Sequence, residues 1–425
     1  MTGLNSGFSG YGSGKRRRFP VFYILLITCC VAAAGLFLMY VYSTVEPPEE
    51  EPEALPLPAF VMQPVETVRS EPEEDDDEYT ELPPAVKVKG IYVGAWFAGN
   101  RERMDNYIDL CETTEINALV LDVKEDHGYI TFLTENEALT RMSRELIPDI
   151  KALVADLKSR GIYTIARVVC FKDPMRSNAE PQYSILDNRG RPWQDGGGTR
   201  WLDPYKRENW EYIAEVCMEA ARLGFEEIQL DYVRFPADGA LSEIDYGPAG
   251  AEHSKTELIS EFVAYIRDIM HQQGLRTSAD VFGIIALSSR DGSHIGQDLQ
   301  LLLPAADSLC PMIYPSHFSN KKQNGTGQIL NGVLYEAPDT EPYGVIFNTL
   351  AHVTRHLDPE VEQAVIRPYL QDFTASYLGE GYFIPYGAAE VLAQIEAVYD
   401  AGFEEWILWN HVSIYSEDAF REPSE

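Results

Sequence analysis

Two aspartates of this 425-residue chain lie at or near the ends of short apolar runs, where catalytic carboxylates often stand. Asp231 ends one run and Asp280 lies in the next. A pair of carboxyl groups can cleave a glycosidic bond, one donating a proton and the other acting as nucleophile or base. A separation of about 5–5.5 Å suits retention and about 6.5–9.5 Å suits inversion, and the sequence does not choose between them. We take Asp231 and Asp280 as the candidate catalytic pair.

Other aromatic and charged residues near the ends of these runs have the types found in sugar sites. Aromatic faces stack on apolar sugar faces, and carboxylates accept hydrogen bonds from hydroxyl groups. The candidate substrate-binding residues are Trp96, Asp122, Glu125, Arg167, Lys172, Trp193, Trp201, Tyr232, Arg234, Tyr314, His317 and Trp409. His317 has no second histidine at metal-ligand spacing, so we expect no metal and no cofactor.

Each acidic candidate also has a structural interpretation. Asp231 could pair with Arg234 or Arg167 instead of meeting a substrate. Asp280 could serve only to orient a neighbouring group. Asp122 is as consistent with an ion pair to Arg167 as with a substrate contact.

Four residues around a long loop have alternatives of their own. Trp193 and Trp201 lie in this loop, and long loops in compact domains are often functional, but the segment could also be a packed lid. Asp173 and Asp203 each precede a proline, the pattern of a helix N-cap followed by proline at the first helical position. We therefore expect these two aspartates to cap helices.

The elements that must position these residues alternate regularly along the chain. Eight runs rich in Val and Ile predict strands at Gly90–Trp96, Ala118–Val123, Tyr163–Val169, Glu227–Asp231, Thr277–Phe282, Ser308–Ile313, Val365–Leu370 and Glu405–Trp409. Helical segments fall between them, at 102–114, 147–160, 205–223, 255–273, 294–303, 342–356 and 388–400. Several helices end at a glycine, the usual C-terminal cap. This alternation predicts a parallel sheet with helices on its faces.

Eight such units predict an α/β fold, a (β/α)8 TIM barrel over residues 89–425. A doubly wound open sheet is the alternative, but no glycine-rich dinucleotide motif follows the first strand. In a closed barrel, the residues at the carboxyl ends of the strands meet at one mouth. The candidate residues above are therefore expected to converge.

The charge distribution bears on possible partners. The net charge is −33, of which residues 1–44 contribute +4 and residues 45–88 contribute −12, which leaves −25 for residues 89–425. A domain this acidic repels phosphate backbones, so nucleic acid is not an expected partner. Neutral or cationic glycans remain open.

The amino-terminal region predicts a membrane anchor. Residues 19–43 form a 25-residue stretch without a charge, and about 20 apolar residues suffice to span a bilayer. Basic residues in 1–18 precede this stretch and predict a cytoplasmic N-terminus, with the barrel outside. A cleaved signal peptide is the alternative. Residues 44–88 are rich in Pro, Glu and Asp, which is typical of a disordered spacer.

Several motifs of the chain occur together in one known family. They are KGIYVGAWFAG (89–99), NALVLDVKEDHG (117–128), IARVVCFKDP (165–174), WLDP (201–204), GFEEIQLDYVRFPADG (224–239), SADVFG (278–283), IGQDL (295–299) and PMIYPSHF (311–318). The chain resembles a bacterial family of glycoside-hydrolase-like proteins with a TIM-barrel fold. The resemblance covers nearly all of residues 89–425 and implies a barrel that acts on sugar.

The resemblance also implies roles for the two acids. By analogy with alpha-amylase-type barrels, Asp231 on the fourth strand is the nucleophile and the carboxyl group on the fifth strand is the acid. Those enzymes commonly use Glu as the acid and this chain has Asp280, so Asp122 or Glu125 is an alternative acid. We therefore expect a membrane-anchored glycoside hydrolase acting on a cell-wall or extracellular polysaccharide. The rival is a glycan-binding barrel without catalysis at the cell surface.

Overall fold

The computed structural model describes residues 82–288, 292–357 and 363–423. The predicted membrane segment 19–43, the residues before it and most of the spacer lie outside these ranges. Within the described ranges, no helix is both long enough and apolar enough to cross a bilayer.

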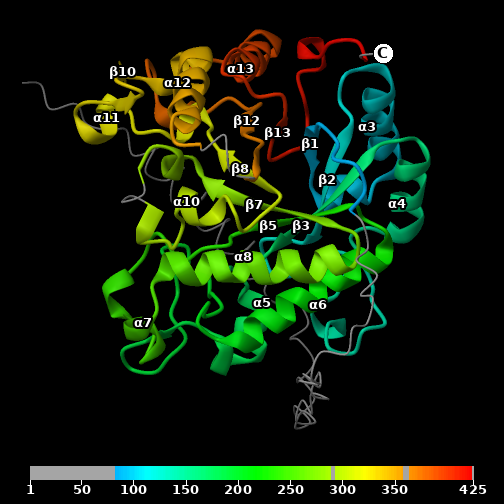
Figure 1. Cartoon of the computed structure of the whole chain (residues 1–425), viewed down its shortest axis with the longest axis vertical. Coiled ribbons are helices and arrows are strands. Elements are labelled where there is room, and N and C mark those ends of the chain that lie inside the picture. Colours follow the sequence, from blue (N-terminus) through cyan, green and yellow to red (C-terminus); the bar gives the residue numbers. More distant parts are fainter. Residues whose placement is uncertain (1–81, 289–291, 358–362, 424–425) are drawn as a thin grey trace, which may run out of the picture. The chain divides into compact units, whose positions relative to one another are not determined.

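The described part of the chain folds around a closed parallel barrel (Figure 1). Its strands are β1 (Lys89–Val93), β2 (Ala118–Lys124), β3 (Tyr163–Val169), β5 (Glu227–Asp231), β7 (Arg276–Phe282), β8 (Ser308–Met312), β11 (Val365–Ile366), β12 (Tyr369–Gln371) and β13 (Trp406–Trp409). Each pairs in parallel with its neighbours, and β1 closes the ring by pairing with both β2 and β13. Because β11 and β12 together fill one position, the barrel has the eight positions that the sequence predicts.

The alternation of side chains along the strands separates two apolar cores. Residues such as Val120 and Ile165 fill the barrel interior. Their strand neighbours Leu119 and Ala166 face outward and pack in the larger core of the domain. All of these residues are buried, which explains why the strands are continuously apolar in sequence.

Helices surround the strands in Figure 1. Those within the described residues are α2 (Ala95–Ala98), α3 (Arg101–Thr113), α4 (Ile150–Ser159), α5 (Pro174–Ala179), α6 (Arg207–Leu223), α7 (Ala249–Glu252), α8 (Lys255–Gln272), α10 (Leu299–Leu302), α11 (Lys321–Asn324), α12 (Pro342–Thr354) and α13 (Ala388–Asp400). Six of the predicted helices match α3, α4, α6, α8, α12 and α13 closely. Gly224 caps α6 with a φ of 95°, a left-handed conformation that glycine adopts without a steric penalty.

Three predicted elements differ from the structure. The first strand ends at Val93, because the backbone turns into the short helix α2 directly after Gly94. The predicted helix 294–303 is reduced to α10, since Gly296 has a φ of 82° and Asp298 caps the helix from outside. The seventh strand is split at residues 367–368, where a proline lacks the N–H that a ladder requires.

Two long loops at the carboxyl ends of β3 and β5 are joined to each other. They contain the short strands β4 (Leu186–Asp187) and β6 (Ile244–Asp245), which pair in antiparallel fashion. A second antiparallel pair, β9 (Gln328–Leu330) and β10 (Val333–Tyr335), lies in the loop after β8. The β4–β6 pair holds the segments that follow β3 and β5 on one side of the mouth.

The end of the predicted spacer contacts the barrel. Val88 is buried in the barrel interior, and the Lys87 carbonyl accepts a hydrogen bond of 2.9 Å from Asn117. The Pro83 carbonyl accepts another, also of 2.9 Å, from Arg276. The packed domain therefore begins before the predicted boundary at residue 89.

Candidate active site

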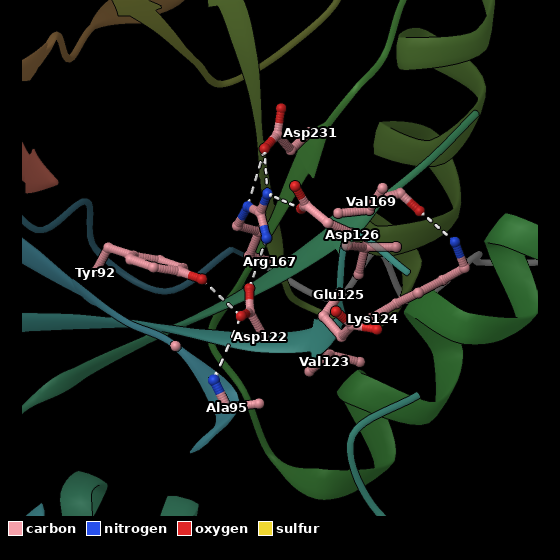
Figure 2. A network of polar contacts seen from close by, with 12 residues as sticks. Tyr92, Ala95, Asp122, Val123, Lys124, Glu125, Asp126, Arg167, Val169 and Asp231 are labelled. Carbon is pink, nitrogen blue, oxygen red and sulfur yellow. Dashed lines mark hydrogen bonds and ion pairs between the residues drawn. The ribbon is translucent and has the colours of Figure 1, made fainter. Parts of the chain in front are cut away.

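Arg167, on β3, is the centre of a charged cluster at the carboxyl ends of the strands (Figure 2). Its Nη1 donates to Asp122 Oδ1 at 2.7 Å, and its Nη2 donates to Asp126 Oδ1 at 2.7 Å. Its Nε and Nη2 both donate to Asp231 Oδ2, at 2.9 and 2.6 Å. Burial opposes the charge of Arg167, but the three carboxylates outweigh it and hold the Arg167 pKa well above its usual value. This one side chain therefore links the ends of β2, β3 and β5.

Asp126 connects Arg167 to two further groups. Asp126 Oδ2 accepts a hydrogen bond of 3.2 Å from the Tyr232 hydroxyl and lies 3.6 Å from Lys172 Nζ. Lys172 Nζ in turn donates to the Tyr232 hydroxyl at 3.2 Å. Burial works against ionisation of Asp126, but the charges of Arg167 and Lys172 prevail and lower its pKa to about 2. The Asp126 carboxyl group is therefore ionised at neutral pH.

Asp122, at the end of β2, orients groups from β1 and α2. Its Oδ2 accepts hydrogen bonds from the Tyr92 hydroxyl at 2.7 Å and from the Ala95 amide at 3.4 Å. Burial raises the pKa of Asp122 although the charge of Arg167 opposes the rise. Both oxygens accept hydrogen bonds from protein donors, and Asp122 forms the ion pair with Arg167 that its structural interpretation predicts.

Asp231 pairs with Arg167, not with Arg234. The next residue, Tyr232, has a φ of 48°, which is costly for a residue with a side chain. This turn places the Tyr232 hydroxyl beside Lys172 and Asp126. Backbone strain of this kind concentrates at functional sites, and here it directly follows a candidate catalytic residue.

Asp280, on β7, has a different environment from Asp231. It is 3% exposed, and its Oδ1 has no hydrogen-bond partner among the described residues. Burial raises its pKa well above the usual value, and the negative charge of Asp231 adds to the rise. Leu230 and Ala279 are partners across β5 and β7, so Asp231 and Asp280 are the next positions on neighbouring strands. The mouth thus holds one ion-paired carboxylate and one carboxyl group that favours its neutral form.

A buried ion pair between Lys124 and Asp173 lies beside this cluster. Lys124, at the end of β2, is fully buried and lies 3.0 Å from Asp173 Oδ2. Lys124 Nζ also donates to the Val169 carbonyl at 2.7 Å (Figure 2). Asp173 Oδ1 accepts from the Arg176 amide at 2.8 Å and caps α5, as the sequence predicts. The prediction for Asp203 is wrong, because α6 begins only at Arg207, with Lys206 at its N-cap.

The opposite side of the mouth is aromatic. Trp409, at the end of β13, is half-buried, and its ring centroid lies 5.7 Å from Tyr314 and 6.5 Å from Tyr92. Phe373 packs edge-on against Trp409 at 5.4 Å. Exposed His317 contacts Tyr314 at 4.9 Å. Burial raises the Tyr314 pKa, and the charges of Asp280 and Asp231 add to this rise.

The structure does not bring every predicted residue to this mouth surface. Trp193 and Trp201 are 4% and 2% exposed, and their indole N–H groups donate to the Ala240 carbonyl and to Asp195 Oδ2. Both rings are buried, as in a packed lid, and neither has an exposed face on which a sugar could stack. Trp96 is not on a strand but on α2, where it is 77% exposed.

The remaining candidates lie among polar groups of the loops. Glu125 accepts from the Tyr129 amide at 3.3 Å and lies 2.7 Å from the ring of His127. Arg234 lies over the rings of Trp201, Tyr232 and Phe282.

Sequence reasoning did not single out Tyr92, and it placed Asp126 after the second strand without giving it a role in the site. Tyr92 lies within a strand, and only the alternation of side chains along β1 would indicate that it faces the barrel interior. Asp126 follows the end of β2 by two residues, and its contact with Arg167 depends on the direction of its side chain, which the sequence does not give.

Comparison with known proteins supports the barrel. The glycoside hydrolase domain of PgaB (BpsB) from Bordetella bronchiseptica is 13% identical, with a TM-score of 0.57 over 77% of this chain and 95% of that one. Alpha-L-fucosidase isoenzyme 2 from Paenibacillus thiaminolyticus is 12% identical, with a TM-score of 0.51; the match covers 79% of this chain and 48% of the fucosidase. At these identities the likeness shows the fold alone.

A third solved structure is more similar in sequence. It is a hypothetical protein from Ruminiclostridium thermocellum, 35% identical over 45% of this chain and 97% of that one, with a TM-score of 0.41. No curated protein matches the sequence. A family model, described as a putative glycosyl hydrolase domain, matches residues 90–415, which span nearly the whole barrel. This chain belongs to that family.

Proposed function

We propose that this protein is a membrane-anchored glycoside hydrolase that cleaves a cell-wall or extracellular polysaccharide. The observation that carries the proposal is the contrast between two acids on neighbouring strands. Asp231 is ion-paired with Arg167, whereas Asp280 is buried and its pKa is raised. Enzymes that cleave glycosides use such pairs, in which the environment keeps one carboxyl group protonated and the other ionised.

In the proposed reaction Asp280 donates its proton to the glycosidic oxygen as the bond to the anomeric carbon breaks. Asp231 stabilises the positive charge that develops on the sugar, and it either attacks the anomeric carbon or activates the incoming water. Water supplies the hydroxyl group of one product. Its remaining proton passes to Asp280 if Asp231 is the nucleophile, or to Asp231 if Asp231 is the base, and in the second case proton exchange with the solvent restores both groups.

The alternative acids are less suited to this role. Asp122 uses both oxygens to accept hydrogen bonds from Arg167, Tyr92 and Ala95. Glu125 accepts from a backbone amide and lies beside His127, and no hydrogen bond or ion pair joins it to Arg167 within the described residues. Asp280 alone among these three has a raised pKa together with an oxygen that lacks a protein partner.

The aromatic side of the mouth supports a sugar substrate. Trp409 and Phe373 are partly exposed and pack against each other and against Tyr314, and sugars stack on such rings. The anchor rests on the sequence of residues 15–43, where basic residues precede a long apolar stretch.

A glycan-binding barrel without catalysis is the second candidate. The observation in its favour is that Arg167 makes two hydrogen bonds to the same oxygen of Asp231. Strong pairing of this kind lowers the reactivity of a carboxylate towards an anomeric carbon. A binding protein would retain glycans at the mouth without releasing new reducing ends.

The test is hydrolysis by the full chain, purified in detergent, of a panel of bacterial wall and extracellular polysaccharides, with new reducing ends as the readout. We expect Asp231→Asn and Asp280→Asn to abolish release. Asp268→Asn, an exposed aspartate of α8 that pairs with Arg267, is the matched control and should retain activity. Activity that survives in both mouth variants would refute the catalytic pair, and binding without turnover would favour the second candidate.

A further inference from the structure

Arg234 is a buried cation at the mouth without an ion pair. It is 7% exposed, and no carboxylate of the described residues lies within 4.0 Å of its guanidinium nitrogens. The guanidinium carbon lies 4.9, 5.2 and 4.5 Å from the ring centroids of Trp201, Tyr232 and Phe282. Its charge is therefore surrounded by aromatic rings.

The donors of this guanidinium are largely unused. Nη1 donates to the Phe235 carbonyl at 2.9 Å, and this is the one hydrogen bond that Arg234 makes in the described part of the chain. Nε is buried without a partner. Nη2 also lacks a partner but is not among the fully buried atoms, so it reaches the surface. The Nε–Nη2 edge, which can bind a carboxylate through two parallel hydrogen bonds, has no partner among the described residues, and Nη2 is the end of it that reaches the surface.

The rings around Arg234 place it beside the catalytic pair. Tyr232 directly follows Asp231 in sequence. Phe282 lies two residues beyond Asp280 on β7, so both side chains point to the same face of the strand. A group bound at Arg234 would therefore belong to a sugar close to the scissile bond.

Nearby acids do not explain the unpaired guanidinium. The negative charges of Asp231, Asp238 and Asp195 favour the charged form of Arg234, but burial outweighs them and lowers its pKa. Asp231 is held by Arg167. Asp195 accepts hydrogen bonds from the Trp201 indole and from two backbone amides of its own loop. Asp238 is exposed and forms no ion pair within the described residues.

We propose that Arg234 binds the carboxylate of an acidic sugar, so that the substrate is a glycan containing uronic acid. This inference rests on the proposed function and names the substrate class of the same site. A buried cation without a partner is costly, and a ligand anion is the partner that would offset this cost. A carboxylate is planar and matches the unpaired edge of the guanidinium.

The acidity of the domain does not exclude such a substrate. Charges on the surface are screened over about 8 Å at physiological salt, whereas a contact inside the mouth is screened much less. The overall repulsion would slow the approach of an acidic polymer, and the local cation would hold the sugar that enters.

The experiment compares matched ligands that differ only in charge. The probes are oligogalacturonates of four to six residues and the same oligosaccharides after reduction of their carboxyl groups to alcohols, and glucuronate-containing hyaluronan oligosaccharides with their reduced forms. Binding to the full chain in detergent is measured by calorimetry, which does not require turnover. We expect at least one acidic probe to bind about tenfold more tightly than its reduced form, or about 1.4 kcal/mol.

The variants assign this preference to Arg234. Arg234→Gln should bind acidic and reduced probes equally, while Arg234→Lys should keep part of the preference because it keeps the charge but loses the fork. The control Arg222→Gln removes an exposed arginine of α6 that pairs with Glu215 and Glu219, and should leave the preference intact. Unfolding temperatures of all variants establish that each is folded.

The outcomes separate this inference from the proposed function. Hydrolysis of neutral glycans without an acidic preference, or a preference that persists in Arg234→Gln, overturns the inference while the enzyme stands. Preferential binding of an acidic probe without hydrolysis of any glycan supports the inference and argues against the enzyme. Failure to bind any acidic probe, or tighter binding of a poly(glycerol phosphate) than of the uronates, also overturns the assignment.

Discussion

Replacing Arg167 by methionine tests the electrostatic account of the mouth most directly. Methionine keeps much of the length and apolar volume of arginine but leaves Asp122 and Asp231, both nearly buried, without their counter-ion. Removing one partner of a buried ion pair costs about 3–5 kcal/mol, because the remaining charge is left desolvated. We take the contribution of Asp126 as smaller, since its side chain is 38% exposed.

We therefore expect Arg167→Met to lower the free energy of unfolding at pH 7 by about 3–5 kcal/mol. The effect should depend on pH. The pKa of Asp126 is lowered to about 2 in the folded protein, so its ion pair stabilises the fold above about pH 4, the unfolded value. That stabilisation disappears as the pH falls towards 2, and the difference between wild type and variant should shrink with it.

The assay is urea unfolding of the full chain in detergent, followed by tryptophan fluorescence at several pH values. Arg160→Met is the matched control, because Arg160 also contacts two carboxylates, Glu112 and Asp156, but at an exposed site. It should lose much less stability, since exposed ion pairs contribute little. A loss below about 1 kcal/mol for Arg167→Met, or one that is equal at pH 7 and at low pH, would refute the reasoning.

Three further predictions follow from single side chains. Asp280→Asn should raise the unfolding temperature at pH 7, because a carboxyl group with a raised pKa destabilises the fold once the pH exceeds its unfolded pKa. The gain should vanish near pH 4, and a gain that persists at low pH would contradict this prediction. Trp201→Ala should cost about 3–5 kcal/mol of unfolding free energy, as for a packed ring, whereas a change in KM alone would favour sugar contact. Trp409→Ala should raise KM several-fold for a cleaved glycan with little change in unfolding temperature, and an unchanged KM would remove Trp409 from the binding surface.

The fold was predictable from sequence because local signals and the tertiary structure agree. Buried parallel strands are apolar throughout, and glycines at helix ends such as Gly161 and Gly224 have the left-handed conformation that their positions suggest. The exceptions have local causes. Gly94 begins a helical turn where the apolar pattern continues as far as Trp96, and the proline after Arg367 divides an otherwise continuous strand.

The polar residues that gather at the strand ends were predictable from the sequence, but their partners were not. Strand ends identified Asp122, Arg167, Asp231 and Asp280, since the barrel brings these ends together. Sequence could not decide whether Asp231 pairs with Arg167 or Arg234, because both lie within reach and the choice depends on side-chain direction. Nor could it separate Trp409, which is partly exposed, from Trp201, which is buried by the joined loops.

The pairing of β1 with β13 has a consequence for biosynthesis. The first strand of the barrel cannot complete its pairing until the last strand has been made, because the ring closes only when Trp406–Trp409 is available. At about 5–20 residues per second, the ribosome needs roughly 15–60 s to make the intervening chain. During that interval one edge of β1 lacks its partner, and unpaired parallel edges promote aggregation. Release of the complete chain is thus a precondition for a closed barrel, and chains truncated before residue 406 should accumulate as insoluble, protease-sensitive material.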